Sequence, residues 1–408
     1  MHTLSIEDFR SFLVRYHFLD NYERLSGKEG IRKLLQRIGS IQYDPLNVVG
    51  RNPDLVLQSR IKNYTGKLLD ELLYKDRVLL DEWDKEMSIY LTRDWSNFHR
   101  IRKVREETAL RTLKHRGQEE VLSYFPQIME ELKTRGPSSA RDLKLGAIQK
   151  NRWGHRQVSG AALDYLYTAG KLGIYKKSNA QKIYDFIENL IPESLLNKDD
   201  PFSTEDDFFE WYFLRRIRSL GAYWLRNGSG WLGFYLSDSG LRKKTLGILE
   251  EKKLIAPIKI SGLDEVLYIC KKDISVLGDQ NNYDGFVRLL APLDNMLWDR
   301  LLVKRIFNFE YSWEVYAPQN KRKYGYYVLP LLYRNNLIAR IELFKYEKGK
   351  ALIVKNLWWE NSINKNDTEL KDAVKKGLEN FANYLEADGV DKKSLEKALK
   401  ARNPPSTN

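Results

Sequence analysis

Apolar residues recur at helical spacing near the start of the chain. An amphipathic helix capped by Ser5 is predicted by Ile6, Phe9, Leu13 and Tyr16. A second helix is predicted from about Lys28 to Ile38, because Gly39 follows it as a typical C-cap. A short extended segment and an amphipathic run over 55–61 come next. Helix, helix, strand and helix in this order are compatible with a winged-helix domain, and residues 67–114 are then predicted to be mostly helical.

Two later segments share one pattern. The first has a helix over 124–135, a short helix over 138–145 and a third helix that leads to a strand at 173–177. The second has a helix over 208–220, a later helix, and strands over 254–260 and 265–270 joined by a turn. Leu163 and Leu166 match Leu246 and Leu249 at one offset, which indicates duplicated units. Each unit is interpreted as a winged helix, whose last helix enters a DNA groove.

The last third of the chain changes character. Strands rich in β-branched and aromatic residues are predicted over 313–317, 326–333, 337–346 and 351–360, and a helix over 367–385. Four consecutive strands are typical of a small barrel or curled sheet. We therefore predict an α+β fold of tandem winged-helix domains followed by a small C-terminal β-barrel. The predicted domains are 1–118 (the first winged helix with a helical extension), 119–200, 201–280 and 281–400.

One short segment carries candidate chemistry. Gln42 and Asp44 lie two positions apart in an extended stretch that Pro45 ends, so both side chains are expected on one face. Ile41 and Tyr43 are expected to turn into the core. A carboxylate beside an amide is able to orient or deprotonate a water. The alternative is a polar turn in which Asp44 caps a nearby backbone N–H.

Composition narrows the function classes. Of the 408 residues, 68 are Lys or Arg and 55 are Asp or Glu, which gives a net charge of +13. This charge is consistent with a polyanionic partner. It is equally consistent with a soluble protein that is simply rich in lysine. Cys270 is the single cysteine, so no disulfide framework is possible. No apolar run is long enough for a membrane span and no signal peptide is evident, so we expect a cytoplasmic protein. The histidines show no zinc-site spacing, and no phosphate-binding glycine loop occurs, so no metal and no cofactor are expected.

With these elements placed, the chain resembles the AlkZ/YcaQ-type winged-helix DNA glycosylases over about residues 5–360. The family signature is Gln, an apolar or aromatic residue, then Gln or Asp, and here it stands as Gln42-Tyr43-Asp44. Further similar segments are Leu55–Arg60, Glu82-Trp83 in an expected helix, Leu290–Arg300, Tyr316–Pro318 and Lys321–Pro330. The chain departs from the family at Asn52-Pro53-Asp54, where many relatives have histidines, and this departure bears on substrate range more than on the reaction class.

The resemblance implies a monofunctional DNA glycosylase that excises alkylated purines, including N7 adducts and interstrand crosslinks. The Asp form of the signature is similar to the YcaQ-type branch, which is linked to crosslink unhooking. Asp44 is implied as the base or electrostatic stabiliser, and Gln42 as the residue that positions water or sugar. Tyr43, Glu82 and Trp83 are candidates for the substrate pocket, with core packing as the alternative. Neither a Schiff-base lysine nor a metal is needed.

Double-stranded DNA is the expected partner, and basic residues are the candidate contacts. These are Arg60, Arg156, Arg242, Lys243, Lys244, Arg300, Lys321, Arg322 and Lys323. The last three are expected at a hairpin tip. The alternatives are solvated surface charges, or structural ion pairs for Arg60 and Arg300. The oligomeric state is open, with a monomer expected. The alternative functions are a non-enzymatic winged-helix DNA-binding regulator and an interaction scaffold.

Overall fold

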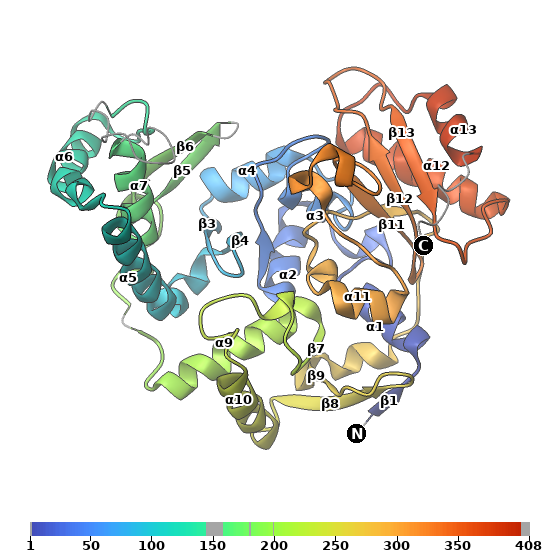
Figure 1. Cartoon of the computed structure of the whole chain (residues 1–408), viewed down its shortest axis with the longest axis horizontal. Coiled ribbons are helices and arrows are strands. Elements are labelled where there is room, and N and C mark those ends of the chain that lie inside the picture. The colour runs from blue at the N-terminus through green and yellow to red at the C-terminus, as the bar shows by residue number, and fades with distance from the viewer. Residues whose placement is uncertain (1, 144–157, 179–180, 199, 401–408) are drawn as a thin grey trace. The chain divides into compact units, whose positions relative to one another are not determined.

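The computed structural model describes residues 2–143, 158–178, 181–198 and 200–400 (Figure 1). The chain is a mixed α+β protein, as predicted. It divides into two compact units, a larger one of Met1–Leu69, Asp84–Ser88 and Phe209–Asn408 and a smaller one of Asp70–Trp83 and Ile89–Phe208. The division into domains at 1–118, 119–200, 201–280 and 281–400 stays a prediction.

The first helices of the larger unit form where the sequence predicts them. Helix α1 (Ile6–Tyr16) begins at Ser5, whose hydroxyl accepts a hydrogen bond from the Asp8 N–H at 3.0 Å. Helix α2 (Gly27–Ile38) ends at Gly39 and leads into strand β2 (Ser40–Gln42). Helix α3 (Asn52–Gln58) has a proline in its first turn, where the missing N–H is tolerated. Local capping signals therefore determine these boundaries.

A four-stranded sheet in the larger unit joins the N-terminus to a distant hairpin. Its strand order is β1-β8-β9-β7, and β1 runs parallel to β8 (Figure 1). The strands are β1 (His2–Leu4), β7 (Ala222–Trp224), β8 (Ile255–Ile260) and β9 (Leu267–Cys270), and the helices before them are α9 (Glu205–Leu220) and α10 (Ser239–Glu251). The predicted hairpin over 254–270 is confirmed, and its partner strand from the N-terminus was not anticipated.

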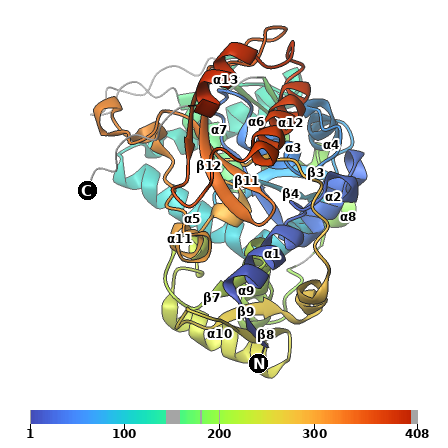
Figure 2. The same ribbon diagram turned by 90° about the vertical axis from the view of Figure 1, so that its right-hand side faces the viewer.

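The second sheet of the larger unit is open. Its antiparallel order is β10-β11-β12-β13, so β10 and β13 are edges, and the strands described here do not close into the predicted barrel. The strands are β10 (Arg288–Leu289), β11 (Val328–Tyr333), β12 (Asn336–Leu343) and β13 (Val354–Trp359). Helix α11 (Arg300–Phe307) lies between β10 and β11 in the chain. Helices α12 (Thr368–Tyr384) and α13 (Lys392–Lys400) follow β13 and pack against the sheet (Figure 2).

One predicted strand of the C-terminal third is wrong. Residues 313–317 contain a 3-10 turn at Glu314–Tyr316, in which the Ala317 N–H donates to the Glu314 carbonyl. The aromatic residues of this stretch pack on one another instead of along a strand, with Trp313 and Tyr316 at 5.7 Å between ring centroids. Lys321 ends a further 3-10 turn over Gln319–Lys321, so residues 321–323 do not form the expected hairpin tip.

The smaller unit is built from helices and a hairpin. Its elements are β3 (Leu79–Trp83), most of β4 (Met87–Leu91), α5 (His99–His115), α6 (Phe125–Arg135), α7 (Val158–Thr168), β5 (Leu172–Ser178), β6 (Gln181–Phe186) and α8 (Glu193–Leu196), and α4 (Gly66–Tyr74) leads into it. The prediction of helix across 67–114 is wrong at β3 and β4. The predicted short helix over 138–145 is wrong for residues 138–143: Ser138 forms a β-bridge with Tyr184 and residues 140–142 form a turn. The rest of this segment lies outside the described residues.

Candidate active site

The chain is held firmly just before and after Gln42. Gly39 ends α2 with a φ of 79°, a left-handed conformation that glycine adopts without strain. A Cβ at this position would lie 3.2 Å from the guanidinium carbon of Arg215. Beyond β2, the Tyr43 N–H donates to the Met87 carbonyl at 2.7 Å. The backbone of the signature segment is therefore fixed on both sides.

Gln42 is buried, with 8% of its surface exposed. Its backbone carbonyl accepts a hydrogen bond from Asn52 Nδ2 at 2.7 Å, and its side-chain Oε1 lies 3.4 Å from Lys85 Nζ. An ammonium group only donates hydrogen bonds, so the amide oxygen faces Lys85 and the amide NH2 group faces elsewhere. Gln42 is thus oriented to offer hydrogen-bond donors away from the lysine.

Asp44 is half-buried and adopts the local turn that the sequence allows. Its Oδ1 accepts the Leu46 N–H at 2.8 Å, across Pro45. Burial raises the pKa of the Asp44 carboxyl, and the hydrogen bond from Leu46 opposes that rise. Among the described residues, the Leu46 N–H is the hydrogen-bond donor to this carboxylate. The turn fixes one oxygen without preventing the other from acting on a ligand.

The amine that faces Gln42 is buried beside an aromatic ring and several charged groups. Lys85 is 7% exposed, and its Nζ is 5.1 Å from the centre of the Trp298 ring. Burial lowers the pKa of Lys85 to about 8, and the nearby positive charge of Arg216 contributes to this decrease. Lys85 is therefore a cation at neutral pH whose charge is lost under mildly alkaline conditions.

A buried ion-pair network supports this position. The Asp84 carboxylate accepts Arg215 Nε at 3.0 Å and Arg216 NH2 at 3.2 Å. Burial opposes ionisation of Asp84, but the two arginines outweigh it and lower the pKa of the carboxyl. Arg215 also donates to the Gly39 carbonyl at 2.9 Å, and Arg216 to the Gly230 carbonyl at 2.7 Å. Helix α9 is thereby tied to the turn before β2.

The segment Leu290–Arg300 supports the backbone of β2. Asn295 Nδ2 donates to the carbonyls of Ser40 at 3.0 Å and Ser219 at 3.2 Å. Trp298 Nε1 donates to the Leu293 carbonyl, which holds the ring in place beside Lys85. The segment Leu290–Arg300, one of those that resemble the family, therefore holds the strand that carries Gln42 in place.

The remaining pocket candidates belong to two different units. Tyr43 is buried in the core of the larger unit, whereas Glu82 and Trp83 belong to the smaller unit and to strand β3, not to the expected helix. Burial raises the pKa of Glu82 to about 7, although Arg102 and Arg105 oppose it. The Arg105 guanidinium also lies 3.6 Å from the centre of the Trp83 ring.

The candidate DNA contacts differ in how deeply their side chains are buried. Arg60 is fully buried, and its guanidinium makes two 2.8 Å hydrogen bonds to Asp294, so it is a structural ion pair and not a surface contact. Arg242 is buried as well and donates to the carbonyls of Leu225 and Leu236. Arg300 is half-buried and donates to the Pro292 carbonyl.

The exposed candidates lie on two segments of the larger unit. Lys243 and Lys244 are exposed in α10, and Lys321 and Lys323 are exposed beside the half-buried Arg322. Arg156 lies outside the described residues. The four exposed lysines are the ones whose charges a phosphate backbone is able to reach.

Several site residues carried no sequence signal. Asp84 and Lys85 stand side by side in a charged stretch, which is typical of a solvated turn. Arg215 and Arg216 fall in a predicted helix with charges on several faces. Their roles depend on contacts with residues more than a hundred positions away in the sequence, which no local pattern reports.

Neither metal-binding clusters nor membrane helices are found in the part of the chain that the structure describes. No group of three or more His, Cys, Asp or Glu residues is placed to hold a metal ion there. No helix among the same residues is long and apolar enough to cross a membrane.

Comparison with known proteins identifies the family. The structure is similar to the solved structure of the Streptomyces sahachiroi DNA glycosylase AlkZ, with a TM-score of 0.63 and 12% sequence identity, over 96% of this chain and 99% of that one. At this identity the match shows a shared fold. The model of the AlkZ-like DNA glycosylase family matches residues 35–384, which is most of the chain and includes Gln42 and Asp44. The chain therefore belongs to the AlkZ-like family of DNA glycosylases.

Proposed function

We propose that the chain is a monofunctional DNA glycosylase that hydrolyses the N-glycosidic bond of alkylated purines in duplex DNA, N7 adducts and interstrand crosslinks included. The observation that carries the proposal is the half-buried carboxylate of Asp44, fixed by the Leu46 N–H and preceded by an oriented Gln42 amide. Both belong to a segment within the family match.

The reaction needs little acid catalysis. An N7-alkylated purine is cationic, so the bond from C1′ to N9 is already weakened. Water attacks C1′ as that bond breaks, the bonding electrons pass to N9, and the purine leaves as a neutral base. Asp44 stabilises the oxocarbenium-like sugar as an anion and accepts the proton of the attacking water. The burial that raises its pKa makes this carboxylate a stronger base.

Gln42 serves as the positioning residue. Because Lys85 occupies its amide oxygen, the amide nitrogen donates to the water or to a sugar oxygen. Lys85 acts through Gln42 in this scheme and forms no covalent bond with the sugar.

DNA is held by surfaces outside the reacting segment. Helix α10 and the β8–β9 hairpin have the order expected of a winged helix, and α10 carries the exposed Lys243 and Lys244. A crosslinked base is tied to both strands and does not swing freely into a closed pocket, so bulky adducts are attacked without full base flipping.

The test uses a duplex with one N7-methylguanine and measures the released base by mass spectrometry. Wild type is expected to release the base, and Asp44→Asn to lose at least about 100-fold of the rate, as for removal of a general base. Asp388→Asn is the matched control, because this exposed carboxylate makes no side-chain hydrogen bond among the described residues. DNA binding without release by wild type would instead favour the regulator.

A further inference from the structure

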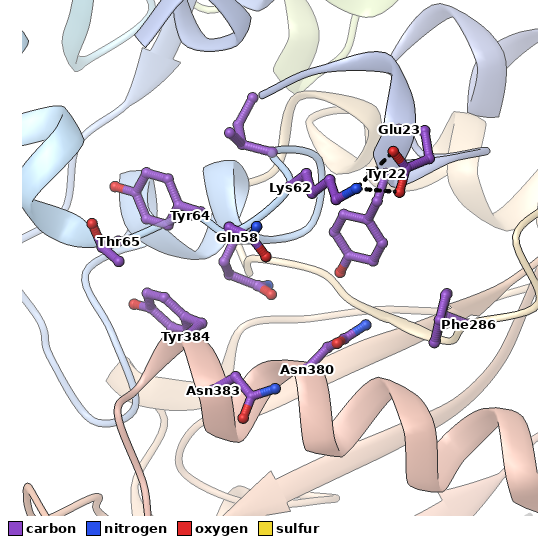
Figure 3. Close-up of a pocket in the computed structure, with 12 residues that line it drawn as sticks. Tyr22, Glu23, Gln58, Lys62, Tyr64, Thr65, Phe286, Asn380, Asn383 and Tyr384 are labelled. Carbon is purple, nitrogen blue, oxygen red and sulfur yellow. Dashed lines mark hydrogen bonds and ion pairs between the residues drawn. The ribbon is translucent and has the colours of Figure 1, made fainter. Parts of the chain in front are cut away.

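The larger unit contains a cavity that the proposed reaction does not use. It has a volume of about 360 Å³, at the small end of the range of about 300–1,000 Å³ typical of small-molecule sites. Its wall comes from the turn after α1, the end of α3 and the following loop, Phe286, and helix α12 (Figure 3). Gln42 and Asp44 do not line it.

Aromatic rings form two sides of this cavity. Tyr22 and Phe286 meet edge to face, with 6.3 Å between their ring centroids. Tyr64 and Tyr384 form a second pair with centroids 5.9 Å apart, across the cavity from the first pair in Figure 3. The Tyr64 hydroxyl donates to Asp54 at 2.6 Å, which fixes its ring. The Arg288 guanidinium covers one face of Tyr22, at 3.6 Å from the ring centre. Aromatic side chains at both ends of the cavity favour a flat, largely apolar ligand.

Amide groups lie between the two aromatic pairs. Asn380 and Asn383 are three residues apart on α12 and therefore share one face, and Figure 3 shows both on the helix below Gln58. Neither asparagine side chain makes a hydrogen bond with the described residues. Two amides with free donors and acceptors on one wall match the edge of a heterocyclic base, as when Asn or Gln pairs with adenine.

Gln58 adds an acceptor to which no described residue donates. The residue is 5% exposed, and its Nε2 donates to the carbonyls of Leu55 at 3.0 Å and Leu289 at 2.8 Å. Both amide hydrogens are thus used, and its Oε1 remains available. This oxygen is not one of the fully buried atoms that lack a partner, so water or a ligand in the cavity reaches it. A ligand that carries an N–H group complements it.

The charge of the cavity wall cancels. Lys62 and Glu23 are its charged lining residues, and they pair with each other at 2.7 Å. No net charge is left on this wall to hold a phosphate or a carboxylate. From the aromatic side chains, the amide pair, the free acceptor and the neutral wall, we propose that this cavity binds a neutral purine base.

Helix α3 connects this cavity to the candidate active site. Asn52 at its first turn holds the Gln42 carbonyl, and Gln58 at its last turn lines the cavity. Seven helical residues span on the order of 10 Å. In the reaction proposed above, a base that leaves the sugar is thus released within one short helix of a site that fits it. Binding itself does not depend on catalysis.

The experiment is isothermal titration of the full chain with adenine, and with cytosine and glucose as comparison ligands. We expect adenine to bind, and more tightly than cytosine or glucose. The Asn380→Ala/Asn383→Ala variant is expected to weaken adenine binding about tenfold, because two hydrogen bonds to the base are removed. Asn366→Ala, an exposed asparagine just before α12, is the matched control and is expected to bind as wild type does.

Failure of this proposal is distinct from failure of the proposed function. Asp44→Asn is expected to bind adenine normally, because Asp44 does not line the cavity. No binding of adenine by the wild type, tighter binding of glucose, or equal binding by the double variant with an unchanged melting temperature would each overturn it. None of these results bears on whether wild type releases an alkylated purine from DNA.

Discussion

Replacing Arg60 by methionine tests whether this arginine is a structural ion pair or a DNA contact. Arg60 and Asp294 are both fully buried and joined by two 2.8 Å hydrogen bonds, and Arg60 also donates to the carbonyls of His17 and Val56. Arg60→Met leaves the Asp294 carboxylate buried without its partner. Breaking a buried pair in this way costs about 3–5 kcal/mol, whereas removing an exposed arginine costs roughly 0–1 kcal/mol.

The assay is urea unfolding followed by tryptophan fluorescence, together with DNA affinity measured against salt concentration. Arg60→Met is expected to lower the free energy of unfolding by about 3–5 kcal/mol and to leave the salt dependence of DNA binding unchanged. Lys321→Met, at an exposed position, is the control and is expected to change that free energy by at most about 0.5 kcal/mol. A variant of Arg60 with normal stability and a shallower salt dependence would refute the reasoning.

Four further predictions concern the reaction and DNA binding. Base release is expected to fall as pH rises through about 8, where Lys85 loses the charge that orients Gln42, and Lys85→Met should flatten this alkaline limb in a pH profile. The acidic limb should lie above the ordinary range of an aspartate, because burial raises the pKa of Asp44, and protonation at low pH removes the base. The Lys243→Gln/Lys244→Gln variant should lower the slope of log affinity against log salt by about 1 for each phosphate that these lysines neutralise. An unchanged slope would show that α10 does not contact DNA. Borohydride should trap no covalent adduct between the protein and a lesion duplex, and an adduct that forms with wild type but not with Lys85→Met would show a Schiff-base mechanism instead.

Local signals made part of the fold predictable. Ser5 and Gly39 mark the start of α1 and the end of α2, because a hydroxyl cap and a left-handed glycine act through their immediate neighbours. The hairpin β8–β9 was predictable for the same reason, since a short turn joins two apolar runs. These elements depend on few residues, all close in sequence.

Errors occurred where partners from distant segments decide the structure. Residues 313–317 have the β-branched and aromatic composition of a strand but find no neighbouring strand among the described residues, and Glu314 instead accepts hydrogen bonds from the backbone N–H groups of Lys323, Tyr324 and Gly325. Strand β3 was predicted as helix within the heavily charged stretch 67–114, although its Asp81 and Glu82 are buried. The composition of a short segment does not show whether its charged side chains are buried.

In the candidate site, too, local features were predictable and contacts between distant segments were not. Gln42 and Asp44 were found from a short motif and a family resemblance, and the turn at Asp44 follows from Pro45. The surroundings that orient Gln42 were not found, because Lys85 reaches it from 43 positions away. For the same reason Arg60 and Arg242 were counted among candidate DNA contacts although both are buried.

The central claim is that the Asp44 carboxylate carries the hydrolysis. Single-turnover release of N7-methylguanine from a duplex, compared between wild type and Asp44→Asn at equal saturation with DNA, measures it most directly. The account predicts a fall of about 10²–10⁴-fold with DNA affinity unchanged. A rate for Asp44→Asn within a few-fold of wild type would contradict it.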